Sequence, residues 1–124
     1  MESALVIDRL SALAQPGRLG VFRLLVRAGP AGMPAGEIAA RLATAPNRLS
    51  AQLTILSQAG LIAGTREGRV IRYAARLETI RDLIVYLMED CCDGRPEICL
   101  PVQAAARAAG CLPASAEGSE AVPA

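Results

Sequence analysis

Four cysteines are the most reactive side chains in this sequence: Cys91, Cys92, Cys99 and Cys111. The chain has 124 residues and no histidine, and all 13 of its basic residues are arginine. These absences exclude histidine acid–base catalysis, histidine metal ligands and a lysine Schiff base. In a reducing cytosol, cysteines serve more often as metal ligands or redox groups than as structural disulfides. We therefore expect thiolate chemistry, and the adjacent pair Cys91-Cys92 is its first candidate.

Length and composition place most of the chain with small compact globular proteins, because 52% of the residues are hydrophobic and 20% are charged. No apolar run approaches the roughly 18 residues that a membrane span needs. The opening Met-Glu-Ser-Ala lacks the positive start of a signal peptide. We expect a cytoplasmic protein without a membrane partner. We also expect no enzyme, because no general base, nucleophile pair or phosphate loop is readable.

The net charge of +1 hides an asymmetry along the chain. Residues 1–77 carry ten arginines and four carboxylates, a net charge of +6, whereas residues 78–124 carry three arginines and eight carboxylates, a net charge of −5. This distribution favours a polyanion-binding surface in the first part and a different role for the second. The alternative is that the arginines only solvate a small, alanine-rich protein.

The spacing of apolar residues predicts four helices in the first half of the chain, over residues 4–14, 16–28, 35–42 and 47–58. Pro16 and Pro46 suit helix starts, and Gly29-Pro30 stops the second helix. The third and fourth helices are short and closely connected. Such a pair is typical of a helix-turn-helix unit.

Residues 61–66 and 69–75 read as two strands of a hairpin that turns at Glu67-Gly68, and residues 77–92 read as a further helix with a wide apolar stripe. Such a stripe often packs on a partner chain. The order ααααββα is that of a winged helix-turn-helix fold, mainly α with a β-hairpin (α+β). We assign residues 1–99 to this DNA-binding and dimerisation domain with its cysteines. We expect residues 100–124 to form a low-complexity, partly disordered tail with one weak helical turn near 104–109.

The predicted helix over 47–58 has a polar outer face, because its leucines point inward. Its outward residues are Asn47, Arg48, Ser50, Ala51, Thr54 and Gln58. Asn and Gln pair with adenine and Arg with guanine in the major groove of duplex DNA. We expect Asn47, Arg48 and Ser50 to contact DNA. The alternative is a protein-interaction module that uses the same fold without binding DNA.

The tip of the predicted hairpin carries Arg66 and Arg69, which we expect to hold phosphates or to enter a neighbouring minor groove. Further candidates for backbone contacts are Arg18, Arg23 and Arg72. One phenylalanine, two tyrosines and no tryptophan provide no aromatic platform for single strands. Duplex DNA is therefore the expected nucleic-acid partner.

Four stretches together resemble the ArsR/SmtB family of metal-responsive repressors. They are residues 13–19, residues 47–53 followed by Leu56, residues 59–61 and residues 66–73. The resemblance covers roughly residues 4–92. It implies a homodimer joined by its first and last helices, which binds an inverted repeat and leaves it when a metal or metalloid binds. It also implies a DNA-facing role for Gln52, while Ala51 stands where the family commonly has histidine.

Two common sensor sites of that family are missing here. The helix before the DNA-reading helix, residues 36–42, has no cysteine, and the chain has no histidine for a zinc site on the last helix. The remaining cluster of Cys91, Cys92 and Cys99 resembles that of arsenical-responsive members with a vicinal pair and a third cysteine. This implies trivalent arsenic or antimony, or a methylated arsenical, as effector, and no organic cofactor.

The chemistry of trivalent arsenic agrees with three thiolates, which this soft ion prefers. Metal–thiolate bonds of zinc-like length place sulfurs roughly 4 Å apart, and the six residues between Cys92 and Cys99 can fold back at small cost. Three alternatives stay open: a zinc site with Cys111 as fourth ligand, a thiol redox sensor, and incidental cysteines. The acidic residues around the pair tend to raise thiol pKa values, which disfavours redox sensing. Whether the ligands come from one chain or two also stays open.

Overall fold

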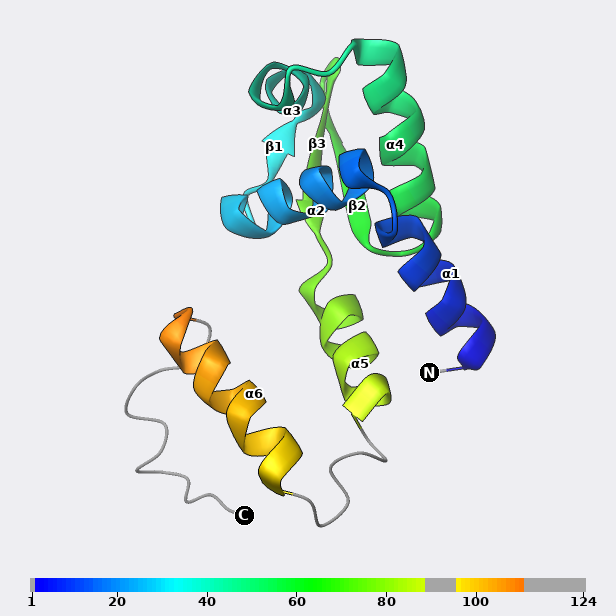
Figure 1. Cartoon of the computed structure of the whole chain (residues 1–124). Helices are drawn as coiled ribbons and strands as arrows, with labels where there is room; N and C mark the ends of the chain where they lie inside the picture. The colour runs from blue at the N-terminus through cyan, green and yellow to red at the C-terminus, as the bar shows by residue number, and fades with distance from the viewer. Residues whose placement is uncertain (1, 89–95, 111–124) are drawn as a thin grey trace. The chain divides into compact units, whose positions relative to one another are not determined.

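The computed structural model of the chain describes residues 2–88 and 96–110. It divides into two compact units, Met1–Ile84 and Val85–Ala124, which are described separately. The elements, in order, are α1 (Ser3–Leu13), α2 (Pro16–Ala28), β1 (Met33–Pro34), α3 (Ala35–Leu42), α4 (Pro46–Gln58), β2 (Ile62–Glu67), β3 (Val70–Ala75), α5 (Leu77–Met88) and α6 (Pro96–Ala108) (Figure 1). This order confirms the predicted winged helix-turn-helix fold.

The helix-turn-helix connection between α3 and α4 closes with backbone hydrogen bonds. Ala43 adopts a left-handed conformation with φ of 50°. The Thr44 amide donates to the Ala39 carbonyl at 3.0 Å, and the Ala43 amide donates to the Ala40 carbonyl at 3.4 Å. These bonds satisfy carbonyls at the end of α3, as in a Schellman turn. Pro46 then starts α4, because its fixed φ suits the first helical position.

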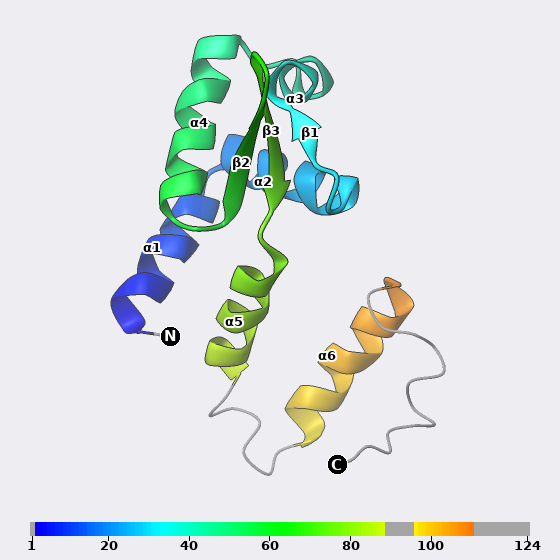
Figure 2. The ribbon, with the colours of Figure 1, turned by 180° about the vertical axis from the view of Figure 1, so that it is seen from behind.

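The sheet has three antiparallel strands in the order β1-β3-β2, one more than the sequence predicted. The additional strand β1 is only two residues long and pairs Met33 with Tyr73 and Pro34 with Arg72. A glycine- and proline-rich segment surrounds it, and Pro34 has no amide proton for a ladder. This composition reads as a loop, so only the pairing with β3 reveals the strand. In Figures 1 and 2, α4 lies on the β2 side of the sheet and α3 on the β1 side.

The core of the first unit is formed by α2, α3, α4 and the start of β2. Its most completely buried side chains include Leu25, Ile38, Leu49, Leu56 and Leu61. These leucines and isoleucines recur at the helical spacing seen in the sequence, so burial of one face of each helix explains why the segments are helical. This packing holds the polar face of α4 outward.

Two arginines tie the ends of helices together within this unit. The Arg9 Nε donates to the Ala59 carbonyl at 3.0 Å, so α1 is joined to the end of α4. The Arg18 Nε donates to the Ala12 carbonyl at 2.6 Å. Cations favour the carbonyl ends of helices, where unpaired carbonyls and the helix dipole attract them. Arg18 therefore caps α1, and its expected phosphate-binding role stays a prediction.

Helix α5 begins as predicted but is described only to Met88, and its predicted end at Cys92 falls outside the described residues. Thr79 and Leu83 are its buried residues. In its first turn, the pKa of Glu78 lies below its ordinary value, because the carboxylate accepts a backbone hydrogen bond at its own residue and a bond from Arg76.

Helix α6 corrects the expectation of a single weak turn at residues 104–109, because it spans 13 residues from Pro96 to Ala108. It also crosses residue 100, where the predicted tail begins. Pro96 suits a helix start and the alanine run favours helix, but Pro101 and the low complexity of the segment concealed this in the sequence. No helix within residues 2–88 and 96–110 is long and apolar enough to cross a membrane.

Candidate nucleic-acid interface

At the start of α4, the residue that precedes the helix provides no side-chain cap. Pro46 is the first helical residue, and Ala45 before it makes no side-chain hydrogen bond. The Asn47 Oδ1 accepts from the Arg48 amide at 2.9 Å. Pro46 has no amide proton and the Leu49 amide donates to the Ala45 carbonyl at 2.9 Å, so the Asn47 backbone amide is the open donor at this helix start. Such a donor and the dipole of a 13-residue helix attract anions. This end of α4 is therefore suited to a phosphate group.

The outer face of α4 carries the side chains expected from the sequence. Asn47, Arg48 and Ser50 are all exposed, as is Thr54, whose hydroxyl donates to the Ser50 carbonyl at 2.9 Å. The Asn47 amide nitrogen stays available as a donor, since only Oδ1 is engaged. Donors and acceptors on an exposed helix of this kind match the edges of base pairs in a major groove.

The expected DNA-facing role of Gln52 does not fit the structure, because its side chain is only 8% exposed. It stands one turn after Leu49 and one turn before Leu56, on the inward stripe of α4. Its Oε1 is buried without a hydrogen-bond partner, and its Nε2 lies against Gly17 of α2. The helical spacing of the leucines could have excluded Gln52 from the DNA-facing set. It packs α4 on α2 instead.

The wing presents Arg66 and Arg69 at its tip, as expected. The strands β2 and β3 end in the Glu67–Val70 pair, so Gly68 and Arg69 form the turn. Gly68 has a φ of +66°, which explains why glycine stands there. Arg66 is exposed, and its Nη1 donates to the Gly68 carbonyl at 3.4 Å. Both guanidinium groups are accessible to a phosphate backbone.

Arg72 is less available than the two arginines at the tip. Its Nε pairs with Glu67 at 3.3 Å, and its Nη1 donates to the Gly32 carbonyl at 3.5 Å. These contacts hold the side chain against the sheet, so the structure supports a role in bracing the wing rather than in free phosphate contact. Arg23 lies exposed on α2.

The start of α4 and the wing carry three exposed arginines without ion pairs. Arg48, Arg66 and Arg69 form no ion pair with any described carboxylate, whereas Arg41, Arg76 and Arg81 each pair with a neighbouring carboxylate. Figures 1 and 2 both place the start of α4 and the tip of the β2–β3 hairpin at the same end of the first unit. An unneutralised guanidinium near a helix start creates a local positive field. This end of the unit is the candidate nucleic-acid interface.

The cysteine site expected from the sequence falls on other parts of the chain. Cys91, Cys92 and Cys111 lie outside the described residues. Cys99 belongs to α6, but only its backbone is described. Within the described side chains, no group of three or more cysteine or acidic residues is arranged to hold a metal ion. The three-cysteine site therefore stays a prediction.

Residues 13–65 match the family model of a helix-turn-helix domain. Among solved structures, an ArsR-like transcriptional regulator from Rhodococcus sp. RHA1 aligns with a TM-score of 0.65 and 24% identity, over 82% of this chain and 93% of that chain. An ArsR family transcriptional regulator aligns with a TM-score of 0.62 and 27% identity, over 73% and 90% of the two chains. The homodimeric winged helix-turn-helix DNA-binding domain of a Mycobacterium bovis protein aligns with a TM-score of 0.58 and 23% identity, over 76% and 84%. No significant match was found among curated proteins.

The matched helix-turn-helix segment contains α3 and α4 and extends into β2. Two of the proteins with this architecture are described as transcriptional regulators of the ArsR type, and the expectation of a regulator, not an enzyme, agrees with them. The chain is a winged helix-turn-helix protein of the kind that such regulators use.

Proposed function

We propose that this chain is a homodimeric transcriptional repressor, which binds an inverted repeat in duplex DNA through α4 and the wing. Trivalent arsenic, bound by the thiolates of Cys91, Cys92 and Cys99, then releases the DNA. The observation that carries DNA binding is the exposed polar start of α4 together with Arg48, Arg66 and Arg69, which are exposed and form no ion pair with a described carboxylate. Phosphate contacts supply most of the affinity of such proteins, and contacts to base edges supply specificity.

Exposed apolar side chains on α1 and α5 support the homodimer. Leu5, Ile7 and Leu10 of α1 are 39%, 63% and 40% exposed, and Leu77 and Ile84 of α5 are 48% and 49% exposed. Burying such residues against a second copy would remove apolar surface from water. A two-fold dimer reads two half-sites about 34–36 Å apart, so the operator would be an inverted repeat.

The release step follows from the place of the cysteines in the sequence. In the sequence, Cys91 and Cys92 follow Met88, the last described residue of α5, which is one of the two helices that we assign to the dimer interface. Three thiolates closing on one ion would shift the relative positions of the two α4 helices. A coupling free energy of about 1–3 kcal/mol lowers DNA affinity about 5- to 150-fold. The thiols must stay reduced, which the cytoplasm ensures.

Replacing Asn47 with alanine is expected to relax sequence preference. Duplexes selected from a random pool serve as specific DNA, and fluorescence anisotropy measures the affinities for them and for random DNA. Loss of one bidentate base contact reduces the ratio of the two affinities by about 1–3 kcal/mol, or roughly 5- to 150-fold. Gln103→Ala, which removes an exposed amide from α6 and not from α4, is the control and leaves the ratio unchanged. Equal losses on both DNAs for Asn47→Ala would contradict a base-reading role.

Replacing Cys91, Cys92 or Cys99 by serine is expected to give a repressor that binds DNA normally and no longer responds to arsenite. Each variant loses one of three thiolates, so the ion is held too weakly to change the dimer. The measurement is anisotropy of the selected duplex during titration with arsenite under reducing conditions. Cys111→Ser is the control and releases DNA like the wild type. A normal response from Cys99→Ser would remove that residue from the site.

Two other outcomes would point to the alternatives. Release by peroxide but not by arsenite identifies a thiol redox sensor, in spite of the acidic residues that surround the cysteine pair in the sequence. Failure to bind any duplex, selected or random, identifies a metalloid-binding or interaction module in which the winged fold is only a scaffold.

A further inference from the structure

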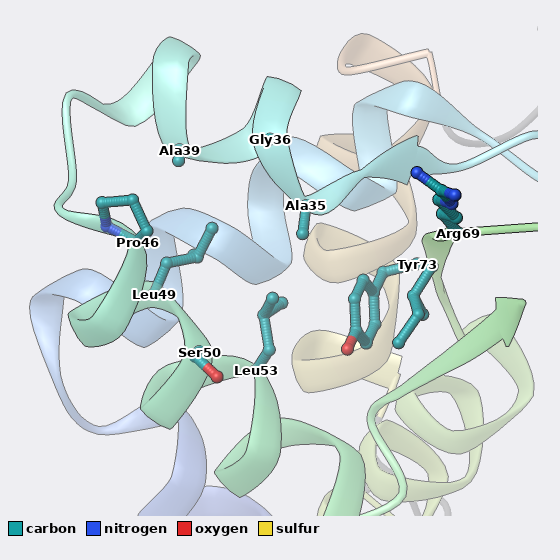
Figure 3. A pocket seen from close by; sticks show the side chains of 10 residues that line it. Ala35, Gly36, Ala39, Pro46, Leu49, Ser50, Leu53, Arg69 and Tyr73 are labelled. Atoms are coloured by element: carbon teal, nitrogen blue, oxygen red, sulfur yellow. The ribbon is translucent and has the colours of Figure 1, made fainter.

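A cavity of about 420 Å³ opens between α3, α4 and β3 in the first unit (Figure 3). Its size lies in the range of small-molecule sites, which are mostly apolar with a few polar groups. Neither the proposed DNA contacts nor the cysteine chemistry explains why these three elements enclose open space there.

Small side chains on α3 leave space open along one wall of the cavity. Ala35, Gly36 and Ala39 face the cavity from α3, and Leu49 and Leu53 face it from α4. Both leucines are almost fully buried, at 2% and 3% exposure, so the floor of the cavity is rigid and apolar. A side chain larger than alanine on this face of α3 would fill the space.

The third wall comes from β3, where Ile71 and Tyr73 lie on the same face because residues two apart in a strand point the same way. Tyr73 pairs with Gly64 on β2. A Cβ atom at position 64 would approach the Tyr73 Cε1 to 2.9 Å, so the ring lies over the bare glycine. Gly64 therefore fixes where the ring stands. Figure 3 shows its hydroxyl turned toward α4.

The polar groups of the cavity favour an anionic ligand. Arg69 lines it and forms no ion pair with a described carboxylate, and no acidic residue is among the lining residues. Ser50 contributes a hydroxyl from α4. The Tyr73 hydroxyl makes no hydrogen bond within the described residues. An apolar body would fill the space, while a carboxylate would form an ion pair with the Arg69 guanidinium, which neither a hydroxyl nor an ammonium group can form.

We propose that this cavity binds a small, flat or branched apolar molecule that carries one carboxylate. Since Ser50 and Arg69 belong both to the cavity and to the proposed DNA surface, the bound molecule weakens DNA binding. Only this second clause rests on the proposed function, because ligand binding itself needs no DNA. The cavity would give the chain an effector site on the DNA-binding unit, separate from its cysteines.

Three matched probes test the charge requirement on the full chain without DNA: 2-naphthoate, 2-naphthylmethanol and 2-naphthylmethylamine. NMR titration, followed at Tyr73 and Ala39, measures their affinities. We expect naphthoate to bind about tenfold more tightly than the alcohol and the amine to bind most weakly. Arg69→Gln should remove the preference for naphthoate while the alcohol still binds. Equal affinities for the three probes, or no shift at Tyr73 and Ala39, would overturn the proposal.

A cavity-filling variant tests the location. Ala39→Phe should abolish binding of naphthoate and of the alcohol, whereas Ala40→Phe, on the exposed side of the same helix, should bind both like the wild type. Thermal melting and the NMR spectrum verify that each variant is folded, and Ala39→Leu replaces Ala39→Phe if the latter is not. Unchanged naphthoate binding by a folded position-39 variant would overturn the proposal.

A DNA titration then separates the two proposals. Naphthoate is expected to weaken binding of the selected duplex to the wild type and to leave DNA binding by folded Ala39→Phe unchanged. Naphthoate binding without any effect on DNA would overturn the coupling. If the chain binds no duplex at all while naphthoate still binds, the proposed repressor function fails and the cavity assignment stands.

Discussion

Replacing Gly32 with alanine is expected to lower the free energy of unfolding by about 3 kcal/mol. Gly32 has a φ of +69°, and alanine in this left-handed region costs roughly 1–2 kcal/mol. An added Cβ would also overlap the Tyr73 carbonyl oxygen, which belongs to the backbone and cannot rotate away. Overpacking of this kind costs typically 1–3 kcal/mol. Urea denaturation followed by circular dichroism measures the change.

Gly20→Ala is the matched control for this substitution. Gly20 lies inside α2, and an added Cβ at that position meets nothing within 4 Å. Alanine is the better helix former, so Gly20→Ala should raise the free energy of unfolding by about 0.5–1 kcal/mol. The two substitutions add the same atoms and should act in opposite directions. A Gly32→Ala protein as stable as the wild type would show that β1 does not pack closely against β3.

The double variant Arg66→Ala/Arg69→Ala is expected to weaken binding to every duplex, whatever its sequence. Each guanidinium that leaves a phosphate costs about 1.5–3 kcal/mol at low salt, roughly tenfold or more in affinity. Loss of two phosphate contacts also reduces the slope of log K against log salt by about 2, because fewer counterions are released. Anisotropy titrations over a range of salt concentrations measure both effects.

The control is the double variant Arg76→Ala/Arg81→Ala, which also removes two positive charges, but from positions outside the wing tip and α4. Both arginines are already engaged in ion pairs, with Glu78 at 3.1 Å and with Asp82 at 2.9 Å. Their removal should leave the salt slope unchanged. If both double variants lower the affinity equally, the effect is one of net charge, and the wing makes no direct phosphate contacts.

Much of the candidate interface could be predicted from helical spacing. Leu49, Leu53 and Leu56 recur along α4 at intervals that place them on one face, and their burial turns Asn47 and Arg48 outward. The wing tip was equally readable, because a glycine between two strand-like segments requires a turn. The outward face of α4 and the turn of the wing both depend on residues that are close together in the sequence, so they can be predicted from it.

Three side chains are less accessible than their types suggest, for a different reason. Gln52 is polar but buried against α2, and Arg18 and Arg72 are charged but held by carbonyls and by Glu67. In each case the deciding contact comes from another element of the fold. A polar side chain in a sequence shows no partner, so its availability for DNA could not be predicted from its type alone.

The sequence was sufficient for the winged helix-turn-helix order and for the outward face of α4, because periodicity, turn residues and side-chain type are local properties. Only the tertiary structure decided which arginines stay unpaired, that β1 completes the sheet, and that α3, α4 and β3 enclose a cavity beside Arg69. These features arise where segments distant in sequence meet. Their packing determines which groups are satisfied within the fold and which remain open to a ligand.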